Sequence, residues 1–420
     1  MRQSQMMPGR WPHRTETPLA PLARTLLLII IGVAVFLLAH RAEAAPETGF
    51  RSFVESLWPE AQARGVSRAT FDEAVEGVTS NPALLKITQI QAEFVKPVWE
   101  YLAAAVSAKR ISAGTEKARE WRETLSRAET TFGVESPVVM GVWGMETNFG
   151  SFAGDSYVIR SLATLAYARY RGDFFKNELL VALQILQEGH VSVAKMKGSW
   201  AGAMGQTQFM PSSFKSWAVD FNNDGKKDIW NSVPDALGST ANYLKQHGWI
   251  AGEAWGYEVT LPQGFSLAGQ DPAHFSSFAK FADAGVRRAN GEALPRGGEA
   301  ALLLPAGIRG PAFLVTPNFK VIKTYNNSTS YALGVALLGD RIAGEPPLRA
   351  AWPTTDRPLS RTQAKEMQTR LQKMGYDVGE LDGKLGEKAS DALRQFQRKA
   401  GMEPDGYPTL KVLERMRKTK

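Results

Sequence analysis

The chain has 420 residues, too many for one small module, and its 44% hydrophobic and 22% charged residues are typical of a globular protein. This composition excludes a wholly disordered chain. The net charge of +8 is spread thinly along the sequence, so it permits an anionic partner without indicating nucleic acid. Because there is no cysteine, disulfides, thiolate nucleophiles, lipid-bearing cysteines and Cys-ligated metals are excluded.

The first 44 residues have the three-part layout of a secretory signal peptide. Arginines precede an unbroken apolar run from Leu26 to Ala39, and the small-x-small sequence Ala42-Glu43-Ala44 follows. The run is short for a membrane span, which needs about 20 residues. We therefore expect residues 1–44 to be removed on export to a bacterial periplasm. An uncleaved N-terminal segment that anchors the chain in the inner membrane is the alternative.

Helical patterns dominate the region that follows. Residues 50–125 repeat apolar side chains at helical spacing. Ser136-Pro137 predicts a helix start with Ser136 as the N-cap, and Gly150 predicts its end. Further helices are expected over Leu162–Tyr170, Phe174–Gln187, Ala236–Gln246 and Tyr331–Ile342.

Strand patterns interrupt the helices from Gly256 onward. Tyr257–Leu261 alternates, and Ala300–Leu304 and Phe313–Lys323 are β-rich runs split by Gly and Pro. We expect a mainly α (α+β) protein whose helical domain, residues 45–342, carries a small β-containing insertion at about 256–323. Four prolines without periodicity mark residues 343–358 as a linker. Residues 359–420 form a separate small domain.

Glu146 is the first candidate for chemistry. It lies in the last turn of an apolar helix, where hydrophobic neighbours and the negative end of the helix dipole both raise a carboxyl pKa. A glutamic acid protonated near neutral pH can serve as a general acid. A helix-end glutamate exposed to solvent is the alternative reading of its position alone.

The segment Gly202–Ser212 is the second candidate. It combines small residues, which let backbone approach a ligand closely, with two amides, Gln206 and Gln208. On an extended segment these amides would face one side and could bind sugar hydroxyls or acetamide groups. The alternative is a structural turn between helices whose amides bind backbone.

Four ordered blocks together resemble one known family. They are Glu146–Gly150, Gly202–Ser212, Ala241–Tyr243 and Tyr325–Tyr331. From about residue 50 to 342 the chain is similar to the family of membrane-bound lytic murein transglycosylase B, whose members have a lysozyme-like helical core. The resemblance therefore implies a lysozyme-like catalytic domain.

The resemblance also implies a mechanism and a set of site residues. Glu146 would protonate the glycosidic oxygen between N-acetylmuramic acid and N-acetylglucosamine, and then accept the proton of the muramic acid 6-hydroxyl as it attacks C1. The product would be a 1,6-anhydromuramic acid end, formed without water. The residues expected to line the sugar cleft or to contribute to it are Gln208, Tyr243, Tyr325, Asn326, Tyr331, Phe209 and Ser212, and Arg171 is expected near the peptide stem.

Two other functions stay open at this point. Most glycosidases use two carboxylates, and the acid nearest downstream of Glu146 is Asp155. A solitary acid suits a nucleophile supplied by the substrate, yet a hydrolytic muramidase could use the same scaffold. A non-catalytic cell-wall-binding scaffold is the alternative from another class. Expected partners are peptidoglycan glycan strands and proteins of cell-wall synthesis or division; we expect a monomer that does not bind nucleic acid.

An Asp/Asn-rich loop resembles an EF-hand calcium loop. Oxygen side chains stand at loop positions 1, 3, 5 and 9, with Gly225 at position 6. Position 12 is Asn231 instead of Glu, so Asp235 would have to supply the missing carboxylate. The expected ligands of a structural calcium ion are Asp220, Asn222, Asp224, Asp228 and Asp235, and no cofactor is required for the chemistry. A solvated turn neutralised by lysines is the alternative.

The C-terminal residues resemble the small three-helix peptidoglycan-binding domain of cell-wall hydrolases. Two Asp-Gly turns, at Asp382 and Asp405, flank a helix whose Ala392, Leu393 and Phe396 would build the core. About 60 residues can fold alone, although marginally. The domain holds no catalytic arrangement, so we expect it to tether the enzyme to the cell wall.

Overall fold

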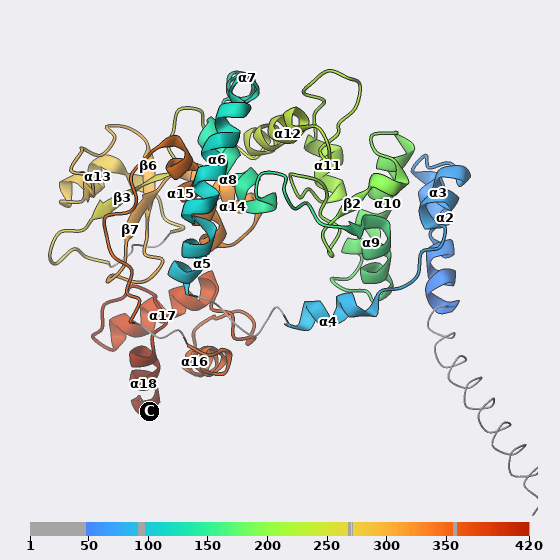
Figure 1. Ribbon diagram of the computed structural model, residues 1–420. Coiled ribbons are helices and arrows are strands. Elements are labelled where there is room, and N and C mark those ends of the chain that lie inside the picture. Colours follow the sequence, from blue (N-terminus) through green and yellow to red (C-terminus); the bar gives the residue numbers. More distant parts are fainter. Residues whose placement is uncertain (1–47, 91–96, 268–269, 271, 356–358, 420) are drawn as a thin grey trace, which may run out of the picture. The chain divides into compact units, whose positions relative to one another are not determined.

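The computed structural model describes residues 48–90, 97–267, 270, 272–355 and 359–419 (Figure 1). The predicted signal peptide, and part of the predicted linker, lie outside the described residues. The chain divides into two compact units, Met1–Ser56 and Leu57–Lys420. In the first unit the described residues 48–56 are helical. Among the described residues, no helix has both the length and the apolar character that a membrane span requires.

Helices form most of the second unit, as the sequence predicts. Among the described residues of this unit, the helices before the first strand are α2 (Trp58–Ala63), α3 (Arg68–Val75), α4 (Pro82–Ile90), α5 (Val98–Ala105), α6 (Ala108–Glu120), α7 (Arg122–Phe132) and α8 (Ser136–Thr147). The helices that follow up to the insertion are α9 (Val158–Tyr167), α10 (Phe174–Gln187), the short 3-10 helix η1 (Val193–Lys195), α11 (Pro211–Trp217) and α12 (Val233–Gln246). Two short strands pair as an antiparallel ribbon: β1 (Ser156–Tyr157), directly before α9, and β2 (Lys197–Gly198), shortly after η1.

The insertion is an antiparallel five-stranded sheet in the order β4-β6-β7-β3-β5. Its strands are β3 (Gly256–Thr260), β4 (Ser276–Ser277), β5 (Arg287–Arg288), β6 (Glu299–Leu303) and β7 (Ala312–Val315), with α13 (Phe278–Asp283) between β4 and β5. Phe278, Phe281, Val286 and Leu314 are buried in the core of this sheet. The sheet therefore has a hydrophobic core of its own, and the polypeptide returns from it into α14 (Pro317–Tyr325) and α15 (Thr329–Ala343).

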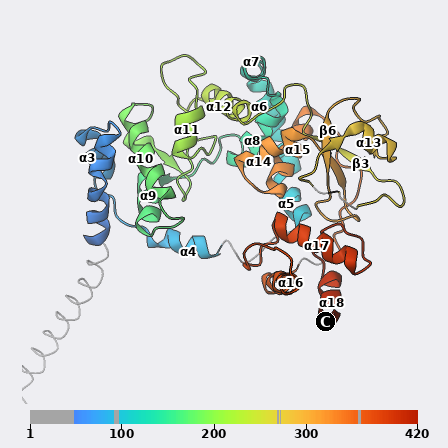
Figure 2. The same cartoon turned by 180° about the vertical axis from the view of Figure 1, so that it is seen from behind.

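The α8–α15 pair forms the centre of the helical core (Figures 1 and 2). The helices are antiparallel, because Gly334 of α15 lies at Met145 near the end of α8, whereas Gly339 lies at Pro137 near its start. A Cβ added to Gly141 would stand 2.2 Å from the carbonyl oxygen of Val335. The two backbones approach this closely only because a glycine is present. This contact fixes the middle of α8 against the middle of α15, and the antiparallel arrangement then places the end of α8 near the start of α15.

Three local predictions differ from the structure. The helix that holds Glu146 begins at Ser136 itself, with Glu135 as the N-cap, because the hydroxyl and the backbone N–H of Ser136 bind the Glu129 carboxylate. The same helix ends before Gly150, since Asn148 already adopts a left-handed conformation with φ 49°. The β-rich run predicted to continue to residue 323 ends at Val315.

The physical reason for that last difference is a helix cap. The hydroxyl of Thr316 accepts a hydrogen bond from the N–H of Asn318, and Pro317 occupies the first turn. This is a strong helix-start signal, and it outweighs the β-branched residues that follow. Residues Pro317–Tyr325 are therefore helical.

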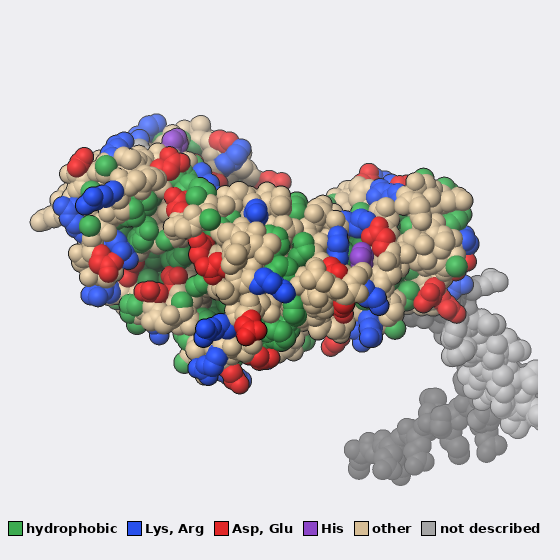
Figure 3. Space-filling view, turned by 90° about the horizontal axis from the view of Figure 1, so that it is seen from above, with side chains coloured by type: hydrophobic (Ala, Val, Ile, Leu, Met, Phe, Trp, Pro, Cys, Tyr) green, Lys and Arg blue, Asp and Glu red, His purple; other side chains and the backbone are tan. Residues whose placement is uncertain are grey.

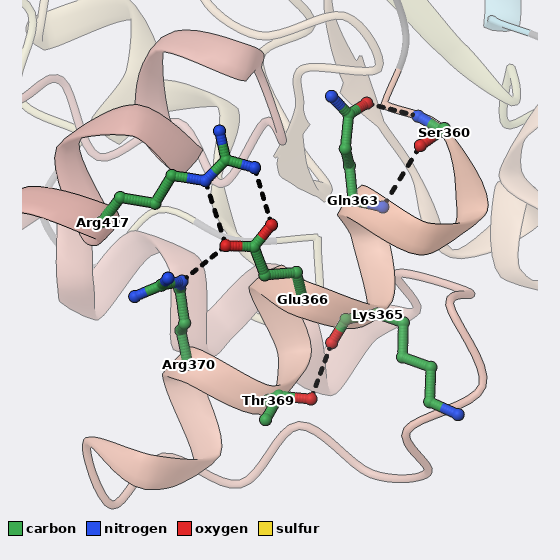
Figure 4. Close-up of polar contacts among 7 residues, drawn as sticks. All are labelled: Ser360, Gln363, Lys365, Glu366, Thr369, Arg370 and Arg417. Atoms are coloured by element: carbon green, nitrogen blue, oxygen red, sulfur yellow. Dashed lines mark hydrogen bonds and ion pairs between the residues drawn. The ribbon is translucent and has the colours of Figure 1, made fainter.

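The C-terminal residues form three helices, α16 (Arg361–Lys373), α17 (Glu387–Lys399) and α18 (Leu410–Lys418). The predicted core is confirmed, since Ala392, Leu393 and Phe396 are all buried. Two buried amides each accept a backbone N–H from a glycine of an Asp-Gly turn: Gln368 binds Gly383, and Gln397 binds Gly406. On the surface, Glu366 of α16 accepts hydrogen bonds from Arg370 and Arg417, and Ser360 and Gln363 form a capping box (Figure 4).

Candidate active site

Glu146 lies in the last turn of α8 and is only partly exposed. Burial raises the pKa of its carboxyl to about 7, and a hydrogen bond from Tyr331 opposes the rise. The C-terminal end of α8 contributes in the same direction as burial, because its carbonyl dipoles disfavour a negative charge. At neutral pH the side chain is therefore present in both protonation states, as an acid that first gives and then takes a proton requires.

Tyr331 holds the carboxylate from the neighbouring helix. Its hydroxyl donates a hydrogen bond to Oε1 of Glu146. The side chain is 5% exposed, and its position is set by the first turn of α15, where the Ser328 hydroxyl accepts the Tyr331 N–H at 3.3 Å. Burial and the Glu146 charge raise the pKa of Tyr331 well above its ordinary value. The phenol therefore stays protonated and acts as a hydrogen-bond donor.

Three further predicted residues form an aromatic cluster beside this pair. The ring centroid of Tyr325 lies 4.7 Å from that of Tyr243 and 5.9 Å from that of Phe209. Both tyrosine hydroxyls donate to backbone carbonyls, Tyr325 to Thr207 and Tyr243 to Thr324, each at 2.9 Å. Phe209 is 2% exposed and Tyr243 7%. Phe209 and Tyr243 thus support Tyr325 from within the core.

The amide-rich segment is a tight turn, so the expectation of an extended segment is wrong and the alternative of a structural turn is confirmed. Met204 and Phe209 are bridged by backbone hydrogen bonds of 2.8 and 3.1 Å, and Gln208 within the turn has φ 52°. Gln206 is buried and accepts the indole N–H of Trp143 at 3.0 Å. The amide of Gln208 donates to the carbonyls of Ala153 and Gly205. The two amides therefore do not share one face, and both bind the protein itself.

The turn is tied directly to the helix that carries Glu146. The hydroxyl of Thr147, the next residue, donates to the carbonyl of Gln206 at 3.0 Å and accepts the N–H of Gly150 at 3.1 Å. A Cβ on Gly150 would lie 2.3 Å from Oε1 of Gln206. The end of α8 and the turn therefore form one hydrogen-bonded unit.

The remaining predicted residues lie at the edges of this unit or away from it. The hydroxyl and N–H of Ser212, at the start of α11, both bind the buried carboxylate of Glu178. Asn326 is exposed and follows α14. Arg171 lies on an exposed loop before α10, with its guanidinium 4.4 Å from the ring centroid of Phe174. The contacts around Glu146 come from other segments, so the structure does not bring Arg171 into that group.

Sequence reasoning missed Tyr101. Burial raises its pKa, and so does the charge of Glu146, whereas Arg110 lowers it. One of its ring carbons would lie 3.4 Å from a Cβ on Gly334 of α15. Tyr101 is therefore a third tyrosine near the carboxylate, carried by α5. No motif marks it, because it is one aromatic residue in an amphipathic helix.

The predicted calcium ligands are only partly brought together. Asp220, Asn222 and Asp224 are linked by hydrogen bonds within the loop. The Asp228 carboxylate instead accepts bonds from Trp230 and Asn231. Asp235 is fully buried, and its carboxylate accepts the backbone N–H groups of Phe221, Asn222 and Asp228. In the described part of the chain, no three acidic or histidine side chains are arranged to hold a metal ion.

Comparison with known families gives two matches. Residues 49–340 match the family described as the transglycosylase SLT domain, which covers more than half of the chain. Residues 360–416 match the family described as a putative peptidoglycan binding domain. Among curated proteins, the membrane-bound lytic murein transglycosylase B of Escherichia coli is 33% identical over 296 residues, which are 66% of this chain and 79% of that protein.

Solved structures of other proteins are also similar to this chain. SltB3 from Pseudomonas aeruginosa, in complex with NAG-anhNAM-pentapeptide, is 46% identical, with a TM-score of 0.84 over 88% of this chain and 99% of that one. The Escherichia coli lytic transglycosylase Slt35, in complex with calcium, is 30% identical, with a TM-score of 0.60 over 71% of this chain and 93% of that one. The predicted lysozyme-like fold is confirmed by these similarities.

Proposed function

We propose that Glu146 is the single catalytic acid and base of this chain, which belongs to the transglycosylase SLT domain family and is a peptidoglycan lytic transglycosylase. The observation that carries the assignment is the carboxyl of Glu146, whose pKa is raised to about 7 while the Tyr331 hydroxyl binds one of its oxygens. The reaction cleaves the bond between N-acetylmuramic acid and N-acetylglucosamine and leaves a 1,6-anhydromuramic acid end.

In the first step the protonated Glu146 gives its proton to the glycosidic oxygen, so the bond from that oxygen to C1 can break. In the second step the carboxylate takes the proton of the muramic acid 6-hydroxyl, whose oxygen forms the new bond to C1. The proton count closes, since Glu146 ends as it began, and no water enters. Tyr331 keeps the carboxylate in place during the exchange and stabilises it while it is charged.

We propose that the sugar chain runs past the exposed faces of Tyr325, Asn326 and Gln208, next to Glu146. Phe209 and Tyr243 support this surface from the core, and Ser212 positions the segment through Glu178. Arg171 lies on the surface of a different loop, where a guanidinium can meet carboxylates of a long peptide stem. Residues 359–420 act as a tether to the wall, residues 343–358 as the linker and residues 45–342 as the catalytic domain.

Digestion of purified sacculi with the mature protein tests the reaction. We expect soluble muropeptides whose sugar ends are lighter by one water than hydrolysed ends. Hydrolysed ends alone would establish a muramidase instead. No release of muropeptides by a folded protein that binds sacculi would establish a non-catalytic scaffold.

The N-terminal segment and the Asp/Asn-rich loop support two further proposals, one on cellular location and one on calcium binding. The N-terminal pattern supports export by a cleaved signal peptide. In the periplasm a monomer would meet its glycan strands and proteins of cell-wall synthesis or division. The reaction needs no cofactor. We further propose a weak, structural calcium site at Asp220, Asn222 and Asp224. The Slt35 relative crystallised with calcium supports it, and a set with only two carboxylates implies low affinity.

A further inference from the structure

The chain leaves α8 through a turn with a strained backbone. Asn148, Phe149 and Gly150 all adopt left-handed conformations, with φ values of 49°, 60° and 76°. Glycine adopts this conformation without strain, whereas a bulky side chain such as that of Phe149 rarely does. The turn begins two residues after Glu146. Strain of this kind persists only where the surrounding structure holds it, so the contacts of the turn bear on the position of the Glu146 carboxyl.

The core side of the turn is held by the ring of Phe149. The side chain is 6% exposed, and its ring centroid lies 5.7 Å from that of Trp143 in an edge-to-face arrangement. Ring carbons of Phe149 would lie 2.8 Å from a Cβ on Gly144 and 2.7 Å from a Cβ on Gly114. The ring therefore fits against α8 and α6 only because both helices have a glycine at the contact.

The solvent side of the turn is held by Arg110, in the first turn of α6. Its Nε donates a hydrogen bond to Oδ1 of Asn148 at 3.3 Å, and its Nη1 donates to the carbonyl oxygens of Ala105 at 2.8 Å and Ala104 at 3.4 Å. Those carbonyls belong to the last turn of α5, where the helix dipole favours a positive charge. One guanidinium thus joins α6, the end of α5 and the turn that follows Glu146.

The contact between Arg110 and Asn148 depends on direction more than on charge. The Nδ2 of Asn148 donates to the Ser151 hydroxyl at 2.9 Å, which leaves its Oδ1 for the guanidinium. On the face of the molecule drawn in Figure 3, lysine and arginine side chains stand among acidic ones. Arg110 differs from such surface charges, because its acceptors are an amide and two backbone carbonyls. A planar guanidinium can donate in several fixed directions at once, which a lysine ammonium cannot reproduce.

The same arginine lies near Tyr101, the tyrosine of α5 beside Glu146. Burial and the charge of Glu146 raise the pKa of Tyr101, and the positive charge of Arg110 lowers it. Tyr101 is therefore within electrostatic reach of both groups. By anchoring the end of α5, the guanidinium also holds the helix that carries Tyr101 beside the carboxylate.

We propose that Arg110 is a positioning residue for the transglycosylase reaction, because its hydrogen bonds brace the left-handed turn against the end of α5 and so keep the Glu146 carboxyl in place. The arginine acts through Asn148 and α5 and takes no part in the proton transfers. The inference rests on the proposed role of Glu146. A displacement of about 1 Å in a catalytic group can cost about 10²-fold in rate. Loss of the brace should therefore lower kcat and leave KM nearly unchanged.

Kinetics on soluble glycan strands of N-acetylglucosamine and N-acetylmuramic acid test the proposal, with anhydro ends measured by mass spectrometry. Arg110→Ala should lower kcat by about 10-fold or more and change KM by less than about 3-fold. Arg110→Lys should recover only part of the loss, since an ammonium lacks the fixed fork of donors. Arg119→Ala, at the exposed end of the same helix, is the control and should keep both wild-type values. An unchanged kcat in Arg110→Ala would overturn the proposal.

A double-mutant cycle separates positioning from a general loss of stability. Asn148→Gly removes the acceptor without adding strain at this φ, and it should lower kcat by itself. The variant with both substitutions should be no slower than Arg110→Ala alone, because the two changes remove the same contact. Circular dichroism selects a temperature at which every variant is folded. Losses that multiply in the double variant would show that Arg110 does not act through Asn148 and would overturn the proposal.

The cycle also distinguishes this inference from the proposed function. Wild-type activity in Glu146→Gln would reject the role of Glu146 itself and, with it, the brace. An inactive Glu146→Gln protein together with a wild-type kcat in Arg110→Ala would reject the brace alone.

Discussion

The hydroxyl of Tyr331, in the first turn of α15, donates a hydrogen bond to the carboxylate of Glu146, in the last turn of α8. The two residues are 185 positions apart in the sequence. They meet because α8 and α15 are antiparallel and approach closely at Gly141. This contact orients the acid, and it opposes the rise in the Glu146 pKa that burial causes.

Replacing Glu146 by Gln should abolish release of anhydro-muropeptides, with a loss of at least about 10²-fold, because the amide can neither give nor take the proton. Mass spectrometry of sacculus digests measures this. Wild-type activity in the variant would show that another group carries the proton.

The same substitution should stabilise the folded protein at high pH. The folded pKa of Glu146, about 7, lies above its ordinary value of 4.5, so the ionised carboxyl destabilises the fold increasingly between these values and fully above pH 7. Glu146→Gln should therefore gain about 1–3 kcal/mol at pH 8 and nothing at pH 4. Thermal unfolding at both pH values measures the difference, and an equal gain at pH 4 would contradict the charge explanation.

Tyr331→Phe should move the pH dependence of the reaction. Removing the hydroxyl takes away the hydrogen bond that lowers the Glu146 pKa, so that pKa should rise and the decline of activity at alkaline pH should begin at a higher pH. The rate should also fall, because the carboxylate is less well held. Tyr243→Phe is the matched control, since that hydroxyl binds Thr324, and its profile should not shift.

Gly141→Ala should destabilise the protein and reduce activity together. The new methyl group would clash with the Val335 carbonyl, a backbone atom that cannot move without displacing α15. Overpacking of this kind costs about 1–3 kcal/mol. Urea unfolding measures it, with Gly297→Ala as control, because a Cβ there meets nothing within 4 Å. Equal stability of the two variants would mean that the helices separate easily.

Glu366 should stabilise the C-terminal domain in a pH-dependent way. Hydrogen bonds from Arg417 and Arg370 lower its pKa from 4.5 to about 2 (Figure 4), so its contribution is complete above pH 4.5 and is lost as the pH falls toward 2. Glu366→Gln should lower the melting temperature at pH 7, and the difference in melting temperature between the variant and the wild type should become smaller in acid. Calorimetry on the full chain tests this, with exposed Glu403→Gln as control; a gap that is constant with pH would exclude the ion pair as its cause.

Millimolar calcium should raise the melting temperature modestly compared with chelator, because an ion that binds only the folded loop stabilises it. Asp224→Asn should remove the rise. Identical melting curves in calcium and in chelator would show that the loop is held by its hydrogen bonds alone.

Much of the fold follows from local sequence signals. The bounds Phe174–Gln187 of α10 agree with the prediction, because its apolar residues repeat at helical spacing over four turns. The predictions that differ from the structure lie at helix caps, where a single hydrogen bond decides the boundary. The Ser136 hydroxyl binds Glu129 instead of capping its own helix. The Thr316 hydroxyl caps the start of a helix where β-branched residues suggested a strand.

The site shows the same division between local and long-range information. The placement of Glu146 at the end of an apolar helix is a property of the sequence, since burial and the helix dipole both follow from neighbouring residues. Tyr101 could not be found from local sequence signals. The roles of Gln206 and Gln208 could not be told apart in the same way, because each role depends on partners far away in the chain. Only the packing of α5, α8 and α15 decides which tyrosine reaches the carboxylate, since a hydrogen bond needs two atoms within about 3 Å and sequence spacing fixes distances only within a single helix or strand.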